Sequence, residues 1–212
     1  VKNYGRKVKF LNFDEAAERI RTNLLRGEAL RGKTGRGNGV RLLDLDGDGF
    51  LDVIIGNARL SRTRLWSAAR SRWSEGALPL KLIENAGAGA GIDAGARFGI
   101  LREDGAASMI CRSRSQAGGW HFENGAWVED PTLLRGLELD GKPVYTSLEG
   151  RDQGVRLRDL DNDGICELIV ANPRRQAVFR RDAETRSWRR LPFSLPRGAI
   201  VADDQGRDAG LR

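Results

Sequence analysis

The 212-residue sequence predicts an all-β fold built from repeated four-stranded antiparallel sheets. Three observations support this prediction: a phrase that recurs at a nearly fixed spacing, short runs rich in β-branched residues, and turn signals between those runs. The recurring phrase is Gly-x-x-x-Gly-apolar-Arg, which begins at residues 35, 91, 150 and 206, with spacings of 56, 59 and 56 residues. A spacing of this size is typical of a chain made of structural repeats.

Each repeat has room for four short strands. Two strands flank a loop that is acidic in two of the repeats, and two flank a polar turn such as Asn124-Gly125, which is a strong hairpin signal. Repeated four-stranded sheets indicate the blades of a β-propeller, in which radial packing covers most sheet edges. The expected parts are a non-repeat segment (1–34), a blade with an acidic loop (35–90), a degenerate blade (91–149), a second blade with an acidic loop (150–205) and the start of a further, truncated blade (206–212).

The first 34 residues do not fit the repeat. The pattern predicts an amphipathic helix over 14–26, capped by an Asn or Asp and with Ala16, Ile20 and Leu24 on one face. We expect this helix to pack against the rim of the propeller, and a partner-binding helix is the alternative.

Two acidic loops share one pattern, with carboxylates at positions 1, 3, 5 and 9 and glycine at position 6. Acidic loop 1 (residues 44–52) carries Asp44, Asp46, Asp48 and Asp52, and acidic loop 2 (residues 159–167) carries Asp159, Asp161, Asp163 and Glu167. A hard cation takes six to eight oxygens, and carboxylates at alternating positions of a tight loop converge to supply them. Gly49 and Gly164 are expected in the left-handed conformation that the turn needs. The pattern therefore predicts two calcium ions, one in each loop.

An EF-hand is the obvious alternative for such a loop, and the sequence argues against it. An EF-hand has a bidentate Glu at position 12 and a helix on each side, whereas position 12 here is Ile55 or Val170 and the flanking residues predict strands. The middle repeat has lost the pattern, because Ile100, Arg102, Asp104 and Ser108 stand at its ligand positions. We expect no metal there.

The stretch from Gly39 to Asn57 resembles an FG-GAP/VCBS-type repeat, and the resemblance extends over roughly residues 35–212. Members of that family form seven-bladed propellers, as in the integrin α-subunit head, and bind calcium in the loop between the first two strands of a blade. The resemblance implies that the carbonyls of Phe50 and Ile165 complete the two ligand sets. The lead-in phrase also resembles repeats of large secreted proteins from planctomycete-like bacteria.

Repeated aromatic residues accompany the strands. Trp73 and Trp188 follow Asn57 and Asn172 at the same distance, and Phe179 stands where Trp120 does. Such residues can form a carbohydrate-stacking platform, but one aromatic per repeat more often fills the space between packed sheets. We therefore expect core roles for them.

The formal net charge is +7, with 30 Arg and 6 Lys. The arginines are scattered among acids in every repeat, so we expect no nucleic-acid binding, whereas attraction to anionic polysaccharide or a cell envelope is physically reasonable. Cys111 and Cys166 fall at different depths of their repeats, which indicates two thiols rather than a disulfide. His121 is the single histidine and is expected to be structural; no nucleophile–base pair stands out.

The predicted function is that of a calcium-binding module that scaffolds or binds a protein or glycan ligand, for example in adhesion. We expect it to be extracellular, periplasmic or on the cell envelope, and to belong to a longer chain whose remaining blades are its partners. No transmembrane segment is expected. The alternative is a non-catalytic domain of a secreted oxidoreductase or polysaccharide-degrading enzyme whose active site lies elsewhere in the parent chain.

Overall fold

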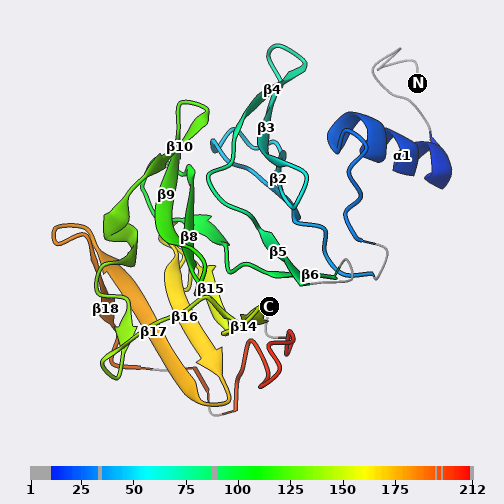
Figure 1. The fold of residues 1–212 in the computed structure, drawn as a ribbon. Helices are drawn as coiled ribbons and strands as arrows, with labels where there is room; N and C mark the ends of the chain where they lie inside the picture. The colour runs from blue at the N-terminus through cyan, green and yellow to red at the C-terminus, as the bar shows by residue number, and fades with distance from the viewer. Residues whose placement is uncertain (1–10, 33–34, 87–89, 194, 197, 211–212) are drawn as a thin grey trace.

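Antiparallel sheets make up most of the molecule, as the sequence predicts (Figure 1). The computed structural model describes residues 11–32, 35–86, 90–193, 195–196 and 198–210. No sheet in these ranges closes into a barrel. Residues 211–212 of the predicted last repeat lie outside the described residues.

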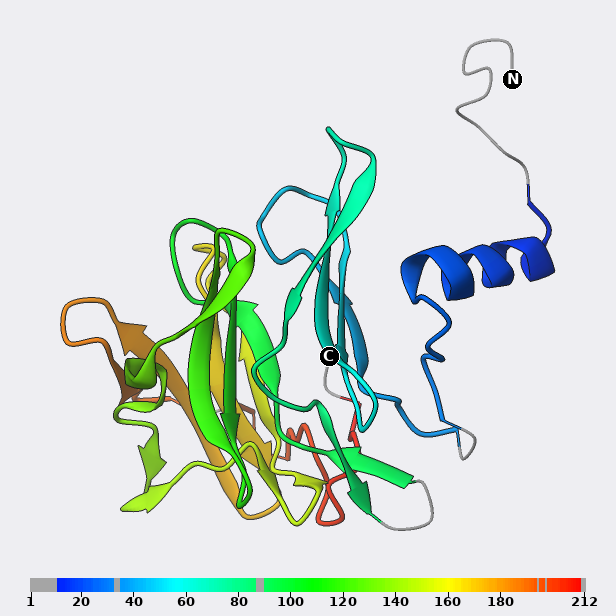
Figure 2. The ribbon, with the colours of Figure 1, turned by 45° about the horizontal axis from the view of Figure 1, so that its top comes forward.

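Three four-stranded sheets follow one another along the chain, each with its strands in sequence order. The first sheet contains β1 (Val40–Leu43), β2 (Asp52–Gly56), β3 (Ser61–Ser67) and β4 (Arg72–Ala77). The second contains β7 (Arg97–Ile100), β8 (Ala107–Arg112), β9 (Ala117–Glu123) and β10 (Ala126–Glu129). The third contains β15 (Val155–Arg158), β16 (Glu167–Asn172), β17 (Arg175–Asp182) and β18 (Ser187–Arg190). Figures 1 and 2 show the three sheets side by side.

A small hairpin or bridge precedes each of the three sheets, and a further bridge follows the third. The hairpins are β5 (Ile83–Ala86) with β6 (Ala90–Asp93), and β13 (Ser147–Leu148) with β14 (Arg151–Asp152). The isolated bridges are Arg31 with Gly37, and Ala202 with Asp208. Gly37, Asp93, Asp152 and Asp208 hold the same place in the four lead-in phrases, so all four phrases form the same local pairing. A further two-stranded pair, β11 (Glu138–Leu139) with β12 (Lys142–Pro143), follows a 3-10 helix at Pro131–Leu134.

The second glycine of the lead-in phrase is required for a steric reason. Gly39 and Gly154 have φ angles of +65° and +72°. A Cβ on Gly39 would lie 2.4 Å from the Gly56 carbonyl oxygen, and one on Gly154 would lie 2.2 Å from the Ala171 carbonyl oxygen. Real Cβ atoms do not approach that closely, and positive φ disfavours any other residue. The phrase therefore fixes how the chain enters the first strand of each sheet.

The core lies between the sheets and is layered. Side chains alternate along the second strand of each sheet, because successive residues of a strand point to opposite faces. Met109 and Cys111 of β8 pack toward the first sheet, and Ile110 between them packs toward the third. The second sheet is therefore covered on both faces. This explains why three consecutive residues of β8, 109–111, are apolar.

The repeated aromatics lie largely in these layers. Trp188 and Phe179 are buried in the layer between the second and third sheets, and the Trp188 indole N–H donates to the Leu133 carbonyl at 2.7 Å. Trp73 packs against Trp66 with ring centroids 5.3 Å apart. The predicted core role is confirmed for Trp188 and Phe179.

The N-terminal helix differs from its prediction. An α-helix, α1 (Phe13–Arg19), continues as a π-helix (Ile20–Leu24), and Asn12 caps it in a capping box with Glu15. No residue of either helix is buried, and Phe13 is 96% exposed. The expected packing of Ala16, Ile20 and Leu24 as one face is only partly seen: Leu24 packs against the cluster that contains Val40 and Val53 of the first sheet, whereas Ile20 is 46% exposed. Figure 2 shows α1 standing apart from the sheets.

The end of this helix is held to the first sheet by one arginine. Arg64 of β3 donates to the carbonyls of Asn23 and Leu24 and lies 4.7 Å above the Trp73 ring. Leu25, just beyond the helix, is buried against the outer face of the first sheet with Val53. That face is covered by the residues that follow the helix.

The second and third sheets are joined through the buried guanidinium of Arg97. It forms ion pairs with Asp93 at 2.7 Å and with Asp152 at 3.0 Å, and its side chain is 10% exposed. It also donates to the carbonyls of Thr146 and Val155, each at 3.0 Å. Burial opposes its charge, but the two carboxylates outweigh burial and raise the pKa of Arg97. Both lead-in hairpins are therefore tied to one side chain.

Replacing Arg97 by Met would leave Asp93 and Asp152 without this partner. We expect the free energy of unfolding, measured by urea denaturation, to fall by about 3–5 kcal/mol, as for other broken buried ion pairs. The control is Arg114→Met, whose exposed side chain pairs with the exposed Glu149 at 3.3 Å. Its effect should stay within about 0.5 kcal/mol. Equal losses in the two variants would contradict the assigned role.

Candidate metal loops

The two acidic loops lie at the same place in the first and third sheets. Acidic loop 1 joins β1 to β2, and acidic loop 2 joins β15 to β16. The predicted strand flanks are confirmed, and no helix adjoins either loop. Gly49 and Gly164 have φ angles of +85° and +90°, as the turn at position 6 was expected to require.

The first aspartate of each loop organises the loop backbone. Asp44 accepts hydrogen bonds from the amides of Gly47 at 2.8 Å, Asp48 at 3.2 Å and Gly49 at 2.8 Å. Asp159 accepts from the amides of Asp163 at 3.2 Å and Gly164 at 2.9 Å. These bonds curl each loop around its first carboxylate.

Positions 5 and 9 repeat the same bonds. Asp48 accepts from the Phe50 amide at 2.9 Å, and Asp163 accepts from the Ile165 amide at 2.8 Å. At position 9, Asp52 accepts from the Leu45 amide and Glu167 from the Leu160 amide, both at 3.0 Å. The longer Glu167 side chain therefore reaches the same backbone donor as Asp52. The two loops are built alike although one ligand position differs in length.

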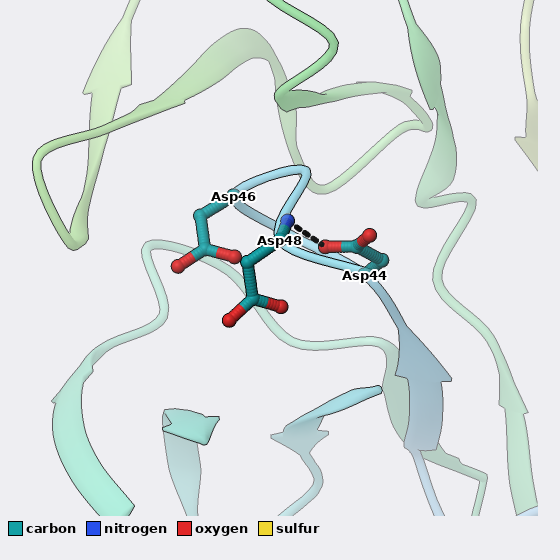
Figure 3. Close-up of side chains that lie close together, drawn as sticks. All are labelled: Asp44, Asp46 and Asp48. Carbon is teal, nitrogen blue, oxygen red and sulfur yellow. Dashed lines mark hydrogen bonds between the residues drawn. The ribbon is translucent and has the colours of Figure 1, made fainter. Parts of the chain in front are cut away.

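Carboxylate oxygens converge in both loops. Ligand oxygens of Asp44, Asp46 and Asp48 all lie within 4.8 Å of one another (Figure 3), as do those of Asp159, Asp161 and Glu167. Two oxygens bound to one calcium ion at roughly 2.3–2.6 Å lie no more than about 5 Å apart. Both sets therefore fit a calcium ion in donor type and spacing. Carboxylates favour a hard cation of this kind over softer transition metals.

The predicted ligand sets are only partly gathered. Asp52 stands outside the three-carboxylate set of loop 1, because its second oxygen accepts from the Trp66 amide at 2.8 Å. Asp163 stands outside the set of loop 2. The carbonyls of Phe50 and Ile165 stand at position 7, two residues after the position-5 aspartates, and their ligand role stays a prediction.

The surroundings of acidic loop 1 disfavour negative charge. Burial raises the pKa of Asp46, and the charges of Asp48 and Asp44 add to the shift. Burial also raises the pKa of Asp52 to about 6, against the opposing hydrogen bonds from the amides of Trp66 and Leu45. A dication among these carboxylates would relieve their mutual repulsion.

Acidic loop 2 contains a cation supplied by the protein itself. The Arg180 guanidinium, from β17, lies 3.0 Å from Asp161 and 3.7 Å from Glu167, and it also contacts Asp163. The charge of Asp161 and then those of Asp163 and Glu167 raise the pKa of Arg180. The sequence pattern gave no sign of this residue, because it lies on the next strand, beyond the motif.

The loop of the second sheet also contains an arginine. Arg102 stands at position 3, and its guanidinium bonds to Asp104 and to Glu123 of β9. The carboxylates near this loop are thus neutralised by Arg102. The side chains of Ile100 and Ser108 supply no carboxylate at positions 1 and 9.

Position 9 of this second sheet takes part in a different network. The Ser108 hydroxyl lies 2.8 Å from His121 Nδ1, and His121 Nε2 lies 3.2 Å from Asp130 Oδ2. Burial lowers the pKa of His121, the nearby Arg102 lowers it further, and Asp130 opposes both. A neutral imidazole then donates from Nε2 to Asp130 and accepts from Ser108. Both ring nitrogens are satisfied, as expected for a structural histidine.

This Ser–His–Asp sequence of contacts does not form a hydrolase site. Ser108 is fully buried, so a substrate carbonyl has no access to its hydroxyl. Asp130 also accepts from Thr132 at the start of the 3-10 helix and from Arg186 at 2.7 Å. The network therefore fixes β9, the 3-10 helix and the turn before β18 relative to one another.

A cleft of about 1030 Å³ borders both this network and acidic loop 2. Residues of the second and third sheets line it, and its basic side chains are Arg102, His121, Arg180, Arg181 and Arg186. Nearly all of these have acidic neighbours in the same wall, so the lining is mixed in charge rather than uniformly basic. The cleft gives solvent a path to Arg180.

Comparison with known proteins gave no match: no family model, no curated protein and no solved structure matches this chain. Within the described residues, no helix has the length and apolar character needed to cross a membrane. Both cysteine thiols are free, with Cys111 buried and Cys166 partly buried.

The Asp130 network predicts a specific pH dependence. Burial opposes the charge of Asp130, but hydrogen bonds from Thr132 and Arg186 outweigh it and lower its pKa to about 2. Because the folded-state pKa is depressed, this contribution is fully present above pH ~4 and is lost as pH falls toward 2. Unfolding free energies from pH 5 to 2 should fall less steeply in Asp130→Asn than in the parent. The control Asp140→Asn, at an exposed turn, should follow the parent curve. An Asp130→Asn curve that runs parallel to the parent curve would refute the assignment.

Proposed function

We propose that this chain is a calcium-binding β-propeller module that serves as a scaffold or ligand-binding domain of a larger extracellular protein. One ion binds in acidic loop 1 and one in acidic loop 2. The observation that carries the proposal is that both loops, 115 residues apart, hold their carboxylates by the same backbone hydrogen bonds and gather three carboxylates within 4.8 Å. An acidic surface turn needs no such construction.

The propeller arrangement draws support from one leucine in each loop. Leu45 is fully buried in the layer between the first and second sheets, and Leu101, at the same loop position, is buried between the second and third. Leu160, the equivalent residue of the third sheet, is 45% exposed. A further sheet of the parent chain packed on the third would bury Leu160 as the others are buried. We therefore place the next blade at this face.

Calcium has a structural role in this proposal. The Leu45 carbonyl accepts from the Ala107 amide at 2.9 Å, so acidic loop 1 is bonded directly to the second sheet. An ion that fixes the loop also fixes Leu45 in the layer between the sheets. The scaffold can then present its exposed loops to a protein or glycan.

Calcium should therefore stabilise the fold. A ligand at about 100 times its dissociation constant adds roughly 2.7 kcal/mol of stability per site. The thermal midpoint should be higher in millimolar calcium than in chelator, and magnesium at the same ionic strength should have a smaller effect. Identical midpoints with calcium and with chelator would show that the loops are not structural calcium sites.

The stoichiometry should follow the acidic loops. Isothermal titration calorimetry should give two calcium ions for the parent, and Asp46→Ala and Asp161→Ala should each remove about one. Asp104→Ala is the matched control in the second sheet, where Arg102 stands at position 3 of the loop, and it should leave two ions bound. A third ion in the parent, or a loss in the control, would refute the assignment of the sites.

A further inference from the structure

We propose that Arg180 is a built-in competitor for calcium in acidic loop 2, so that the two loops bind the ion with different affinities. This inference rests on the proposed calcium sites and concerns their regulation. Loop 1 is the tighter site, and loop 2 binds only when calcium displaces the guanidinium.

The geometry of Arg180 carries this inference. Its three nitrogens face the carboxylates of Asp161, Asp163 and Glu167, which are three of the four carboxylates predicted to bind the ion. A guanidinium presents its donors in a fixed fork and engages carboxylate lone pairs directly. Calcium needs those same lone pairs, and two cations cannot share them at contact distance. Binding in loop 2 is therefore an exchange of one cation for another.

Acidic loop 1 provides the comparison within the same chain. The strand register pairs Leu168 with Phe179 in the third sheet and Val53 with Arg64 in the first. Leu168 and Val53 each directly follow position 9 of their loop, so Phe179 and Arg64 are equivalent. The next residues along those strands, Arg180 and Leu65, are therefore equivalent as well. Leu65 packs against the apolar layer between the first and second sheets and carries no charge. Loop 1 thus has no competing cation at this position.

The second sheet shows the extreme case of the same chemistry. His121 holds the position of Leu65 and Arg180, and it bonds to Ser108 at position 9. Arg102 has replaced the carboxylate at position 3 and bonds to Asp104. The three loops therefore form a series: carboxylates without a guanidinium, carboxylates with one from the neighbouring strand, and a loop in which arginine is permanent.

The Arg180 side chain has room to move away from acidic loop 2. Its side chain is 43% exposed, and it lines the 1030 Å³ cleft beside acidic loop 2. The released guanidinium can therefore move into solvent without unfolding the sheet. A buried arginine would instead block the ion outright. The partial exposure makes Arg180 an adjustable competitor.

The test exchanges the two side chains. Calcium affinity of loop 2 is measured by titration calorimetry in the Asp46→Ala background, which removes loop 1, and that of loop 1 in the Asp161→Ala background. Arg180→Leu should tighten loop 2 by about tenfold, the size expected for losing a partly exposed ion-pair network. Conversely, Leu65→Arg should lower the calcium affinity of loop 1. Arg180→Leu and Leu65→Arg thus give each loop the other's side chain.

Arg189→Leu controls for the loss of one positive charge on the third sheet. Arg189 is paired with Arg180 across β17 and β18, and in the described structure it donates no hydrogen bond to acidic loop 2. Its effect on loop 2 should stay below about twofold. An unchanged affinity in Arg180→Leu, or an equal gain in Arg189→Leu, would overturn the competitor role while leaving the calcium sites intact. Failure of both single-loop backgrounds to bind calcium would instead refute the proposed function.

Discussion

The arrangement of the second and third sheets depends on one buried guanidinium. Arg97 satisfies two carboxylates and two backbone carbonyls that belong to different hairpins and strands. A buried charge is costly unless its hydrogen-bond partners are all in place. The placement of β7, β15 and their lead-in hairpins in this structure meets that condition. The register of the two sheets is therefore tied to the partners of one side chain.

Register in turn positions the acidic loops. Each loop begins where a first strand ends and finishes at the first residue of the second, so the strands fix the distance between position 1 and position 9. Leu45 and Leu101 anchor their loops in the adjacent layers. In acidic loop 1, the buried Leu45 holds the loop against the second sheet, and the mutual repulsion of its carboxylates is the cost that a bound cation would offset.

The same kind of loop occurs in all three sheets, but its carboxylates are held or paired in three different ways. In the first sheet, backbone amides alone hold the carboxylates; in the second, Arg102 neutralises Asp104 and Glu123; in the third, Arg180 reaches in from β17. Several carboxylates held within a few ångströms repel one another until one of them is protonated or a cation lies beside them. Under the proposed function, the three loops differ in which cation balances their carboxylates and in how easily that cation exchanges.

The sequence by itself determined the local structure of this protein. Spacing of the lead-in phrase, the alternation of apolar residues and the glycines at position 6 predicted antiparallel sheets and the loops between their first two strands, because these features depend on residues close together in the chain. The carboxylates of both candidate sites were predicted in the same way. The tertiary structure alone decided which distant groups meet: Arg180 with Asp161, His121 with Asp130, and Arg97 with Asp152. It also showed that the N-terminal helix packs against the first sheet at Leu24 while Phe13 and Ile20 stay exposed, since amphipathic periodicity predicts a helix but not the surface that covers it. Such contacts depend on how strands from separate parts of the chain stack, and no short-range pattern records that geometry.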